Sequence, residues 1–297
     1  METKSGLKLS ALQMNSVTGN KQANLEKVYT LVSQNLEAGT DILILPEVWT
    51  VGWDCEEFAK SAENINNSGV IKFLSKLAKK YHMYIIGGSF IRQADDGRLY
   101  NSCPVFNREG DLIALYDKNH LYSYCGCNEG TYITPGDRGV IVDIDGIKTG
   151  LTICYDIRFP EIFREYRKKD VKLLINAAAW GAAKPIPWEV LTKARAIENQ
   201  AFMVALTQCG PIDLANWNIG HSRIINYLGE TIAEIKNQKE GLMNCRISFE
   251  EMENYRKQCP ILNDIKEKYE VKTYEKTVNN TACSNGCDGS CGTSQNS

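Results

Sequence analysis

The sequence predicts a mixed α/β protein in which two mixed β-sheets are flanked by helices. Two observations support this class. Short apolar strand patterns alternate with amphipathic helix patterns over residues 7–258, and hairpin turns are interleaved among them. In addition, three strands are followed directly by residues that can carry chemistry, and open α/β folds form their ligand sites outside the carboxyl ends of strands.

The N-terminal elements are predicted from hydrophobic periodicity. Residues 7–14 alternate between apolar and polar side chains, which predicts a half-buried strand. Apolar side chains then recur on one helical face over residues 25–36, and Gly39 is a suitable stop. A short apolar strand over residues 41–45 follows, and a second amphipathic helix covers residues 70–81.

The middle of the chain is predicted to be rich in hairpins. A strand over residues 84–90 ends among glycines. Asp- and Gly-containing turn signals then delimit short strands at residues 99–106 and 112–116. Asp145-Gly146 is a further hairpin turn, and the strand after it runs towards Cys154.

The C-terminal half continues the alternation of helices and strands. The predicted elements, in order, are a helix after Phe159, a strand at 171–178, a helix at 187–199, a strand at 201–208, a hairpin joining 221–227 to 230–235, a last core strand at 241–248 and a helix at 249–258.

We predict one domain over residues 1–272 and a tail over residues 273–297. The tail is rich in Asn, Ser, Gly and Thr and is expected to be disordered. Its three cysteines, Cys283, Cys287 and Cys291, could bind a soft metal with a fourth ligand, but the composition favours an unstructured tail without metal. The Cys125-Gly126-Cys127 pair lacks two further ligands, so we predict no metal site.

Bulk composition excludes several function classes. The 297-residue chain carries a net charge of -2, so it has no basic field for nucleic acid or acidic lipid. No apolar stretch is long enough to span a bilayer, and residues 1–6 have no signal-peptide character. The 11 cysteines are an odd number scattered through apolar segments, which favours a reducing cytoplasm over a disulfide framework.

Cys154 is the first candidate catalytic residue. It follows the apolar run Gly150–Ile153 and precedes a charged segment, so the chain turns there from a strand into a helix. A thiol at such a turn is exposed, and the helix start favours the reactive thiolate over a free thiol, whose pKa is about 8.5. The competing interpretation is a small core residue.

Glu47 and Lys118 also follow apolar strands. Each alone could be a solvated loop acid or a surface amine. Together with Cys154 they would bring a base, an electrophile and a nucleophile to one edge of the sheet.

Three motifs in this order resemble the nitrilase, or carbon–nitrogen hydrolase, superfamily: Leu45-Pro46-Glu47, Asp117-Lys118-Asn119-His120-Leu121 and Ile153-Cys154-Tyr155-Asp156. The resemblance covers residues of about 7 to 270, with further matches at 134–137, 195–199 and 220–223. It implies a four-layer αββα sandwich that dimerises through the helices flanking the sheets. Arg158-Phe159-Pro160-Glu161 and the ending from Tyr255-Arg256 to Pro260 are most similar to the small omega-amidase-like branch.

The resemblance also implies roles for site residues. Glu47 would be the general base, Cys154 the nucleophile that forms a thioester, and Lys118 the donor to the developing oxyanion, with the backbone N–H of Tyr155 as second donor. The ammonium of Lys118 is also expected to favour the thiolate. Glu129 matches a second family glutamate that would orient Lys118 or bind the departing amine; without the resemblance it would be a loop acid.

Other candidates keep two interpretations. Arg158 could grip a substrate carboxylate or pair locally with Asp156 or Glu161. Trp180 could line the pocket or fill the core. His120 could bond locally or form a papain-like pair with Cys154.

One departure bears on substrate identity. Pro187 replaces a histidine common in that branch, which removes one polar contact to a substrate. The helix itself is expected to survive, because proline suits a first helical turn.

We therefore predict a cytoplasmic cysteine amidohydrolase that acts without a cofactor and forms a homodimer or a higher homo-oligomer. Its partners would be water and a small linear amide, with an omega-amide as the best guess and ammonia as a product. A nitrilase, an N-carbamoyl-amine hydrolase and an acyl transferase are alternatives that share the thioester. A non-catalytic binding or metal-handling protein that uses the cysteine-rich tail is the alternative of another class.

Overall fold

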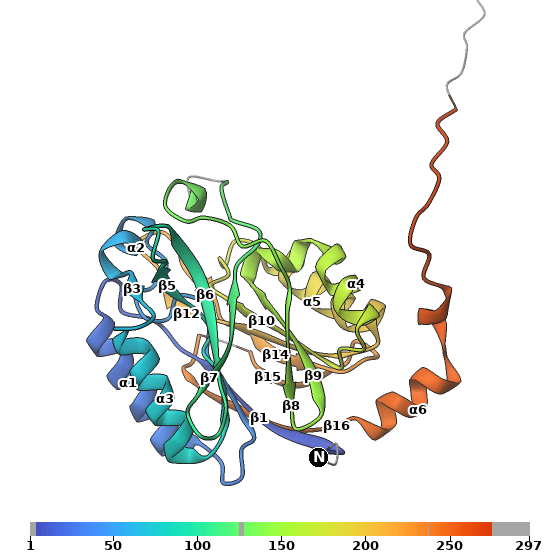
Figure 1. Ribbon diagram of the computed structural model, residues 1–297, viewed down its shortest axis with the longest axis horizontal. Helices are drawn as coiled ribbons and strands as arrows, with labels where there is room; N and C mark the ends of the chain where they lie inside the picture. Colours follow the sequence, from blue (N-terminus) through green and yellow to red (C-terminus); the bar gives the residue numbers. More distant parts are fainter. Residues whose placement is uncertain (1–3, 125–127, 237, 275–297) are drawn as a thin grey trace, which may run out of the picture. The chain divides into compact units, whose positions relative to one another are not determined.

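The computed structural model describes residues 4–124, 128–236 and 238–274 (Figure 1). The chain divides into two compact units, Met1–Pro260 and Ile261–Ser297. The predicted domain boundary at residue 272 stays a prediction. Most of the predicted tail, with its three cysteines, lies outside the described residues, and so does the Cys125–Cys127 pair. No described helix combines the length and apolar character needed to cross a bilayer.

The first of the two large sheets contains β1 and β16, the first and last strands of the chain unit Met1–Pro260. Its strands run in the order β16-β1-β2-β4-β6-β5-β3, and β7 pairs with β6. β1, β2 and β4 are parallel, whereas β16 and β6 are antiparallel to their neighbours. The strands are β1 (Gly6–Gln13), β2 (Ile42–Ile44), β3 (Glu63–Asn64), β4 (Tyr84–Ile86), β5 (Phe90–Gln93), β6 (Leu99–Phe106), β7 (Leu112–Asp117) and β16 (Gly241–Ser248).

The second sheet has the order β15-β14-β11-β10-β9-β8. Its centre is parallel, because β10 pairs in parallel with both β9 and β11. A separate short ladder joins β12 to β13. The strands are β8 (Val140–Ile144), β9 (Ile147–Ile153), β10 (Leu173–Ala178), β11 (Phe202–Thr207), β12 (Cys209–Pro211), β13 (Trp217–Ile219), β14 (Ser222–Ile225) and β15 (Thr231–Ile235).

Side-chain alternation along the strands separates the apolar layers. In β2, Ile42 and Ile44 face the core between the two sheets, whereas Leu43 faces the core under the outer helices. Helices α1 (Lys21–Asn35) and α3 (Gly69–Tyr81) cover that outer face of the first sheet. This arrangement explains why so short a strand is apolar at every position.

The second sheet is covered in the same way by α4 (Pro160–Lys168) and α5 (Pro185–Asn199) (Figure 1). Their buried side chains, Phe163 and Trp188 among them, belong to the same apolar cluster as the buried side chains of β9, β10 and β11. Helix α6 (Glu250–Gln258) follows β16. The layers are therefore helix, sheet, sheet and helix, and the predicted αββα sandwich is confirmed.

The structure departs from the predicted elements in four places. The strand expected at 84–90 is two strands, because the chain bends at Gly88, where φ is +63°. A Cβ there would lie 2.0 Å from the carbonyl oxygen of Pro46, so only glycine fits. The short elements α2 (Cys55–Ser61), β3 and the β12–β13 ladder were not predicted, since they are too brief for a clear period.

Candidate active site

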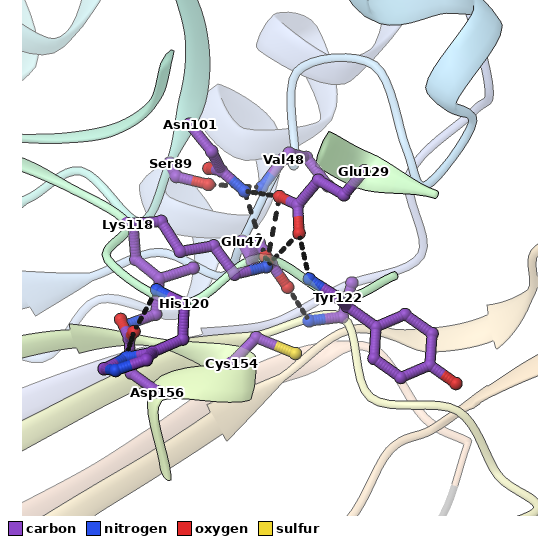
Figure 2. Close-up of polar contacts among 12 residues, drawn as sticks. Glu47, Val48, Ser89, Asn101, Lys118, His120, Tyr122, Glu129, Cys154 and Asp156 are labelled. Atoms are coloured by element: carbon purple, nitrogen blue, oxygen red, sulfur yellow. Dashed lines mark hydrogen bonds and ion pairs between the residues drawn. The ribbon is translucent and has the colours of Figure 1, made fainter. Parts of the chain in front are cut away.

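The ends of strands β2, β7 and β9 bring three predicted residues together (Figure 2). Glu47 follows β2, Lys118 follows β7 directly, and Cys154 follows β9 directly. Glu47 and Lys118 are completely buried, and Cys154 is 7% exposed. The alternatives of a solvated loop acid and a surface amine are therefore wrong for Glu47 and Lys118.

Lys118 is the centre of the charged cluster. Its Nζ donates to Oε1 of Glu47 at 2.8 Å and to Oε2 and Oε1 of Glu129 at 2.8 and 3.1 Å. Glu129 opens the short 3-10 turn η1 (Glu129–Thr131) and is itself fully buried. The backbone N–H of Tyr122 also donates to Oε2 of Glu129 at 2.8 Å, so this carboxylate binds both the ammonium of Lys118 and the main chain at Tyr122.

The turn that carries Glu47 is held by both sheets. The Oε2 atom of Glu47 accepts the backbone N–H of Ala179, just after β10, at 2.8 Å. The side-chain amide of Gln208 donates to the Glu47 carbonyl at 2.7 Å. The hydroxyl of Ser89 accepts the N–H of Val48 at 2.8 Å, which fixes a valine whose φ is +40°.

The turn at Cys154 is a strained one. Cys154 has a φ of +43°, a conformation that costs of order 1–3 kcal/mol for a residue with a side chain. Cys154 begins the 3-10 turn η2 (Cys154–Arg158), and the α-helix starts only at Pro160. The predicted bend from strand into helix is present, and the helix predicted after Phe159 begins at Pro160.

Asp156 holds this turn in place. Its fully buried carboxylate accepts the N–H of Ile153 at 2.9 Å, the hydroxyl of Tyr116 at 2.6 Å and the N–H of His120 at 2.9 Å. The Nδ1 atom of His120 lies 2.8 Å from Oδ1 of the same carboxylate. Asp156 thus connects the Cys154 turn with the segment that follows Lys118.

The cluster's charges are set by burial and by Lys118. Burial raises the pKa of Glu47 above the ordinary value, and the charge of Glu129 adds to this, against the opposing attraction of Lys118. For Lys118, burial alone would lower the pKa, but attraction to Glu129, Glu47 and Cys154 holds it well above the ordinary value. The ammonium is therefore the persistent charge of the site.

The thiol of Cys154 behaves differently from the prediction. Burial and the neighbouring charge of Glu47 raise the pKa of the thiol well above its ordinary value, and the attraction of Lys118 does not overcome them. The direction of this shift favours a neutral thiol beside Glu47 over the predicted thiolate. Burial could not be read from the sequence, and it outweighs the ammonium.

Cys154 opens into a cavity of about 1050 Å³. Four predicted residues line it: Cys154, Tyr155, Arg158 and Trp180. The Arg158 guanidinium lies 5.2 Å from the ring centre of Trp180 and 5.8 Å from that of Tyr155. Trp180 is only 4% exposed, so it both lines the cavity and belongs to the core.

Within the described residues, the Arg158 side chain has no ion pair. The expected alternative, a local pair with Asp156 or Glu161, is absent there, because Asp156 is occupied by Tyr116 and His120. The only other described cation of the cavity wall is Lys184, whose Nζ donates to the hydroxyl of Tyr122.

His120 bonds locally, as the first of its two interpretations stated. Its ring stacks on Phe159 with centroids 3.7 Å apart, in addition to the contact with Asp156. A papain-like pair with Cys154 is not formed in the structure. Pro187 lies in the first turn of α5, as expected.

Sequence reasoning missed Asn101, in the middle of β6. Its Nδ2 donates to Oε1 of Glu47 at 3.0 Å and to Oε1 of Glu129 at 3.1 Å. β6 also contains the polar Ser102, so no apolar run singles out Asn101 in the sequence. The structural role of Asp156 was missed too, because its partners come from distant segments. Among residues 4–124, 128–236 and 238–274, no group of three or more His, Cys, Asp and Glu side chains could hold a metal ion.

Comparisons with known proteins agree with this geometry. The family model described as carbon-nitrogen hydrolase matches residues 8–257. A 2-oxoglutaramate amidase from Bacillus subtilis is 33% identical over 259 residues, which cover 87% of this chain and 97% of that protein. The human omega-amidase NIT2 is 31% identical over 261 residues, with coverage of 86% and 92%.

Solved structures support the same assignment. A CN-hydrolase superfamily protein from Xanthomonas campestris, whose active site holds an arsenic adduct, superposes with a TM-score of 0.82 at 26% identity, covering 90% of this chain and all of that one (100%). Nit3 from Saccharomyces cerevisiae, a member of branch 10 of the nitrilase superfamily, gives a TM-score of 0.80 at 26% identity, with coverage of 87% and 96%. The chain therefore belongs to the carbon–nitrogen hydrolase family, and it is a hydrolase of carbon–nitrogen bonds other than peptide bonds.

Proposed function

We propose that the protein is a cysteine-dependent omega-amidase that hydrolyses a small linear amide bearing a carboxylate at its other end. The observation that carries the proposal is the buried contact of Lys118 with Glu47 beside Cys154, at a cavity whose wall holds the guanidinium of Arg158, which forms no ion pair within the described residues. The carboxylate–ammonium–thiol set supplies the chemistry, and Arg158 supplies the selectivity.

Acylation begins with the neutral thiol. Cys154 Sγ attacks the amide carbon while its proton passes to Glu47, and the carbonyl oxygen becomes an oxyanion. Lys118 has three N–H donors, which face one oxygen of Glu47 and both oxygens of Glu129, so donation to the oxyanion replaces the longer contact with Oε1 of Glu129 at 3.1 Å. The backbone N–H of Tyr155 is the proposed second donor; one such donor contributes about 2.7–4 kcal/mol to lowering the barrier.

Collapse of the intermediate breaks the carbon–nitrogen bond. The proton held by Glu47 moves to the leaving nitrogen, which departs as ammonia and leaves a thioester on Cys154. Glu47 then takes a proton from water as the water attacks the thioester. The carboxylic acid product leaves, and the proton returns to the sulfur. Glu129 holds Lys118 in position throughout these steps.

The cavity wall carries the carboxylates of Asp54, Glu56 and Asp213 as well as two cations, and it is Arg158 that supports a substrate with an anionic end. Arg158 presents a planar, permanently charged fork between two aromatic rings and has no ion pair within the described residues. Nitriles and simple N-carbamoyl amines offer no carboxylate for such a group. The relatives named 2-oxoglutaramate amidase and omega-amidase agree with this preference.

A substrate panel tests the proposal. Purified protein is assayed for ammonia release with dicarboxylic acid monoamides, with neutral amides of the same chain length, with aliphatic nitriles and with N-carbamoyl amines. We expect the monoamides to have the highest kcat/KM. Preference for a nitrile or a carbamoyl amine would overturn the substrate assignment. The same panel with a variant that ends at residue 274 tests the tail alternative, because loss of turnover there would favour a function of the cysteine-rich segment.

We also propose a cytoplasmic homodimer. Ile186, Val190 and Ile197 recur on one face of α5 and are 73%, 56% and 48% exposed, which supports an interface on this helix layer. Sedimentation velocity checks the dimer, and Val190→Asp is expected to shift it to monomer. The odd number of cysteines supports a reducing compartment, and fractionation of the source cells tests that location.

A further inference from the structure

We propose that Asn101 is a positioning residue that locks Glu47 and Glu129 onto Lys118 and keeps Glu47 in its basic form. The inference rests on the proposed role of Glu47 as general base and adds a residue that this role requires. Asn101 lies in β6, away from the strand ends that carry the other members of the cluster.

Four atoms form a closed arrangement (Figure 2). Oε1 of Glu47 accepts from Lys118 Nζ at 2.8 Å and from Asn101 Nδ2 at 3.0 Å. Oε1 of Glu129 accepts from the same two nitrogens, each at 3.1 Å. Each of the two oxygens is thus held between an ammonium and an amide, and neither carboxylate can rotate without breaking two hydrogen bonds.

The charge count explains why an amide stands at this position. Glu47, Glu129, Lys118 and Asn101 are all completely buried, so two carboxylates share one ammonium away from water. A second cation in place of Asn101 would lower the pKa of Glu47 and so make its carboxylate a weaker base. A neutral donor stabilises the excess negative charge without adding a positive one.

The backbone of Asn101 also contacts Lys118. Its carbonyl accepts the N–H of Lys118 at 2.9 Å, and the neighbouring pair in the β6–β7 register is Ser102 with Asp117. Asn101 therefore fixes Lys118 at its backbone and, through the two carboxylates, at its ammonium. The amide orientation is unambiguous, since Nδ2 faces only carboxylate oxygens while Oδ1 has no partner among the described residues.

This arrangement also selects the oxygen that reacts. Among the hydrogen bonds of the described residues, Oε1 of Glu47 accepts two, whereas Oε2 accepts one, from the N–H of Ala179. Oε2 is therefore the oxygen left for the proton of Cys154. The charged and titratable groups that face Glu47 are Lys118 after β7, Glu129 in η1 and Cys154 in η2.

The test measures how fast iodoacetamide alkylates Cys154 as a function of pH, read by peptide mass spectrometry. Alkylation needs the base but no substrate, so it separates this inference from the proposed function. Asn101→Leu removes a hydrogen bond to the ionised carboxylate of Glu47, so the pKa of Glu47 should rise. The pH at which alkylation becomes half-maximal should therefore rise by about one unit, which corresponds to about 1.4 kcal/mol. The acidic limb of kcat/KM should move by the same amount.

Two further variants keep the result interpretable. Asn199 is also buried, and its Nδ2 donates to a helix carbonyl far from the cavity, so Asn199→Leu makes the same chemical change elsewhere. It should alter the unfolding temperature and leave the pH limb in place. Asn101→Ala provides the same test if Asn101→Leu does not fold. An unshifted limb in the folded Asn101 variant, with only lower stability, would overturn the proposal.

Discussion

Glu47 and Ala179 join the two sheets at the site, because Oε2 of Glu47 accepts the Ala179 N–H at 2.8 Å across 132 positions of sequence. Glu47 follows β2 of the first sheet and Ala179 follows β10 of the second. Glu47 belongs to one sheet and the Cys154 turn, which follows β9, to the other. The reactive geometry therefore depends on the packing of the two sheets against each other.

The first prediction concerns the base. Glu47→Gln keeps the shape of the side chain but cannot accept the thiol proton, so kcat should fall roughly 10²- to 10⁴-fold. Steady-state ammonia release measures this. The unfolding temperature should change little in comparison, because the amide still occupies the buried space. A variant with more than half of the original kcat would contradict the role of Glu47.

The second prediction concerns pH. Burial holds the pKa of Glu47 above its ordinary value of 4.5, and the protonated carboxyl cannot act as base. Activity should therefore fall as the pH is lowered through an apparent pKa above 4.5. Because Glu47, Lys118, Glu129 and Cys154 interact, this limb belongs to the cluster. A pH profile of kcat/KM that stays flat down to pH values near 4 would be inconsistent with a buried base.

The third prediction concerns the substrate's carboxylate. Arg158→Gln should lower kcat/KM for monoamides of dicarboxylic acids roughly 10- to 100-fold, since a hydrogen bond to a charged group contributes about 1.5–3 kcal/mol. A neutral amide of equal length should lose little. Arg246→Gln, at an exposed position of β16, is the matched control and should behave like the original protein. Equal losses for charged and neutral amides would rule out the proposed contact.

The fourth prediction concerns the turn beneath Cys154. In Asp156→Asn, an NH2 group replaces one of the two carboxylate oxygens, which accept the N–H groups of Ile153 and His120. One of these buried N–H groups then has no acceptor. Each such group costs about 1–3 kcal/mol, and the strained turn should relax. We expect a lower unfolding temperature and a lower kcat. Asp137→Asn, on the surface, is the control; identical behaviour of the two variants would exclude the structural role.

The strand ends could be recognised from sequence because a polar residue directly after a short apolar run is a local signal. Glu47, Lys118 and Cys154 were found in that way, and the αββα layers followed from periodicity and resemblance. Asn101 carries no such signal, since its position opposite Lys118 arises only from the pairing of β6 with β7. The Ala179 N–H is equally hidden, because no local pattern links it to Glu47.

The charge state of Cys154 could not be predicted either. Sequence shows an ammonium and a helix start nearby, and both favour a thiolate. The structure adds burial of the thiol and the neighbouring charge of Glu47, and these favour the neutral thiol. A pKa depends on the balance of burial against neighbouring charges, and that balance is a property of the packed structure.

The covalent intermediate is the most direct test of the central claim, that Cys154 is a nucleophile activated by Glu47. Enzyme turning over a dicarboxylic acid monoamide is quenched in acid and digested, and its peptides are analysed by mass spectrometry. The account predicts an acyl group on the Cys154 peptide and its disappearance, together with ammonia release, in Cys154→Ala. An acyl group on a different residue, or undiminished ammonia release by Cys154→Ala, would contradict it.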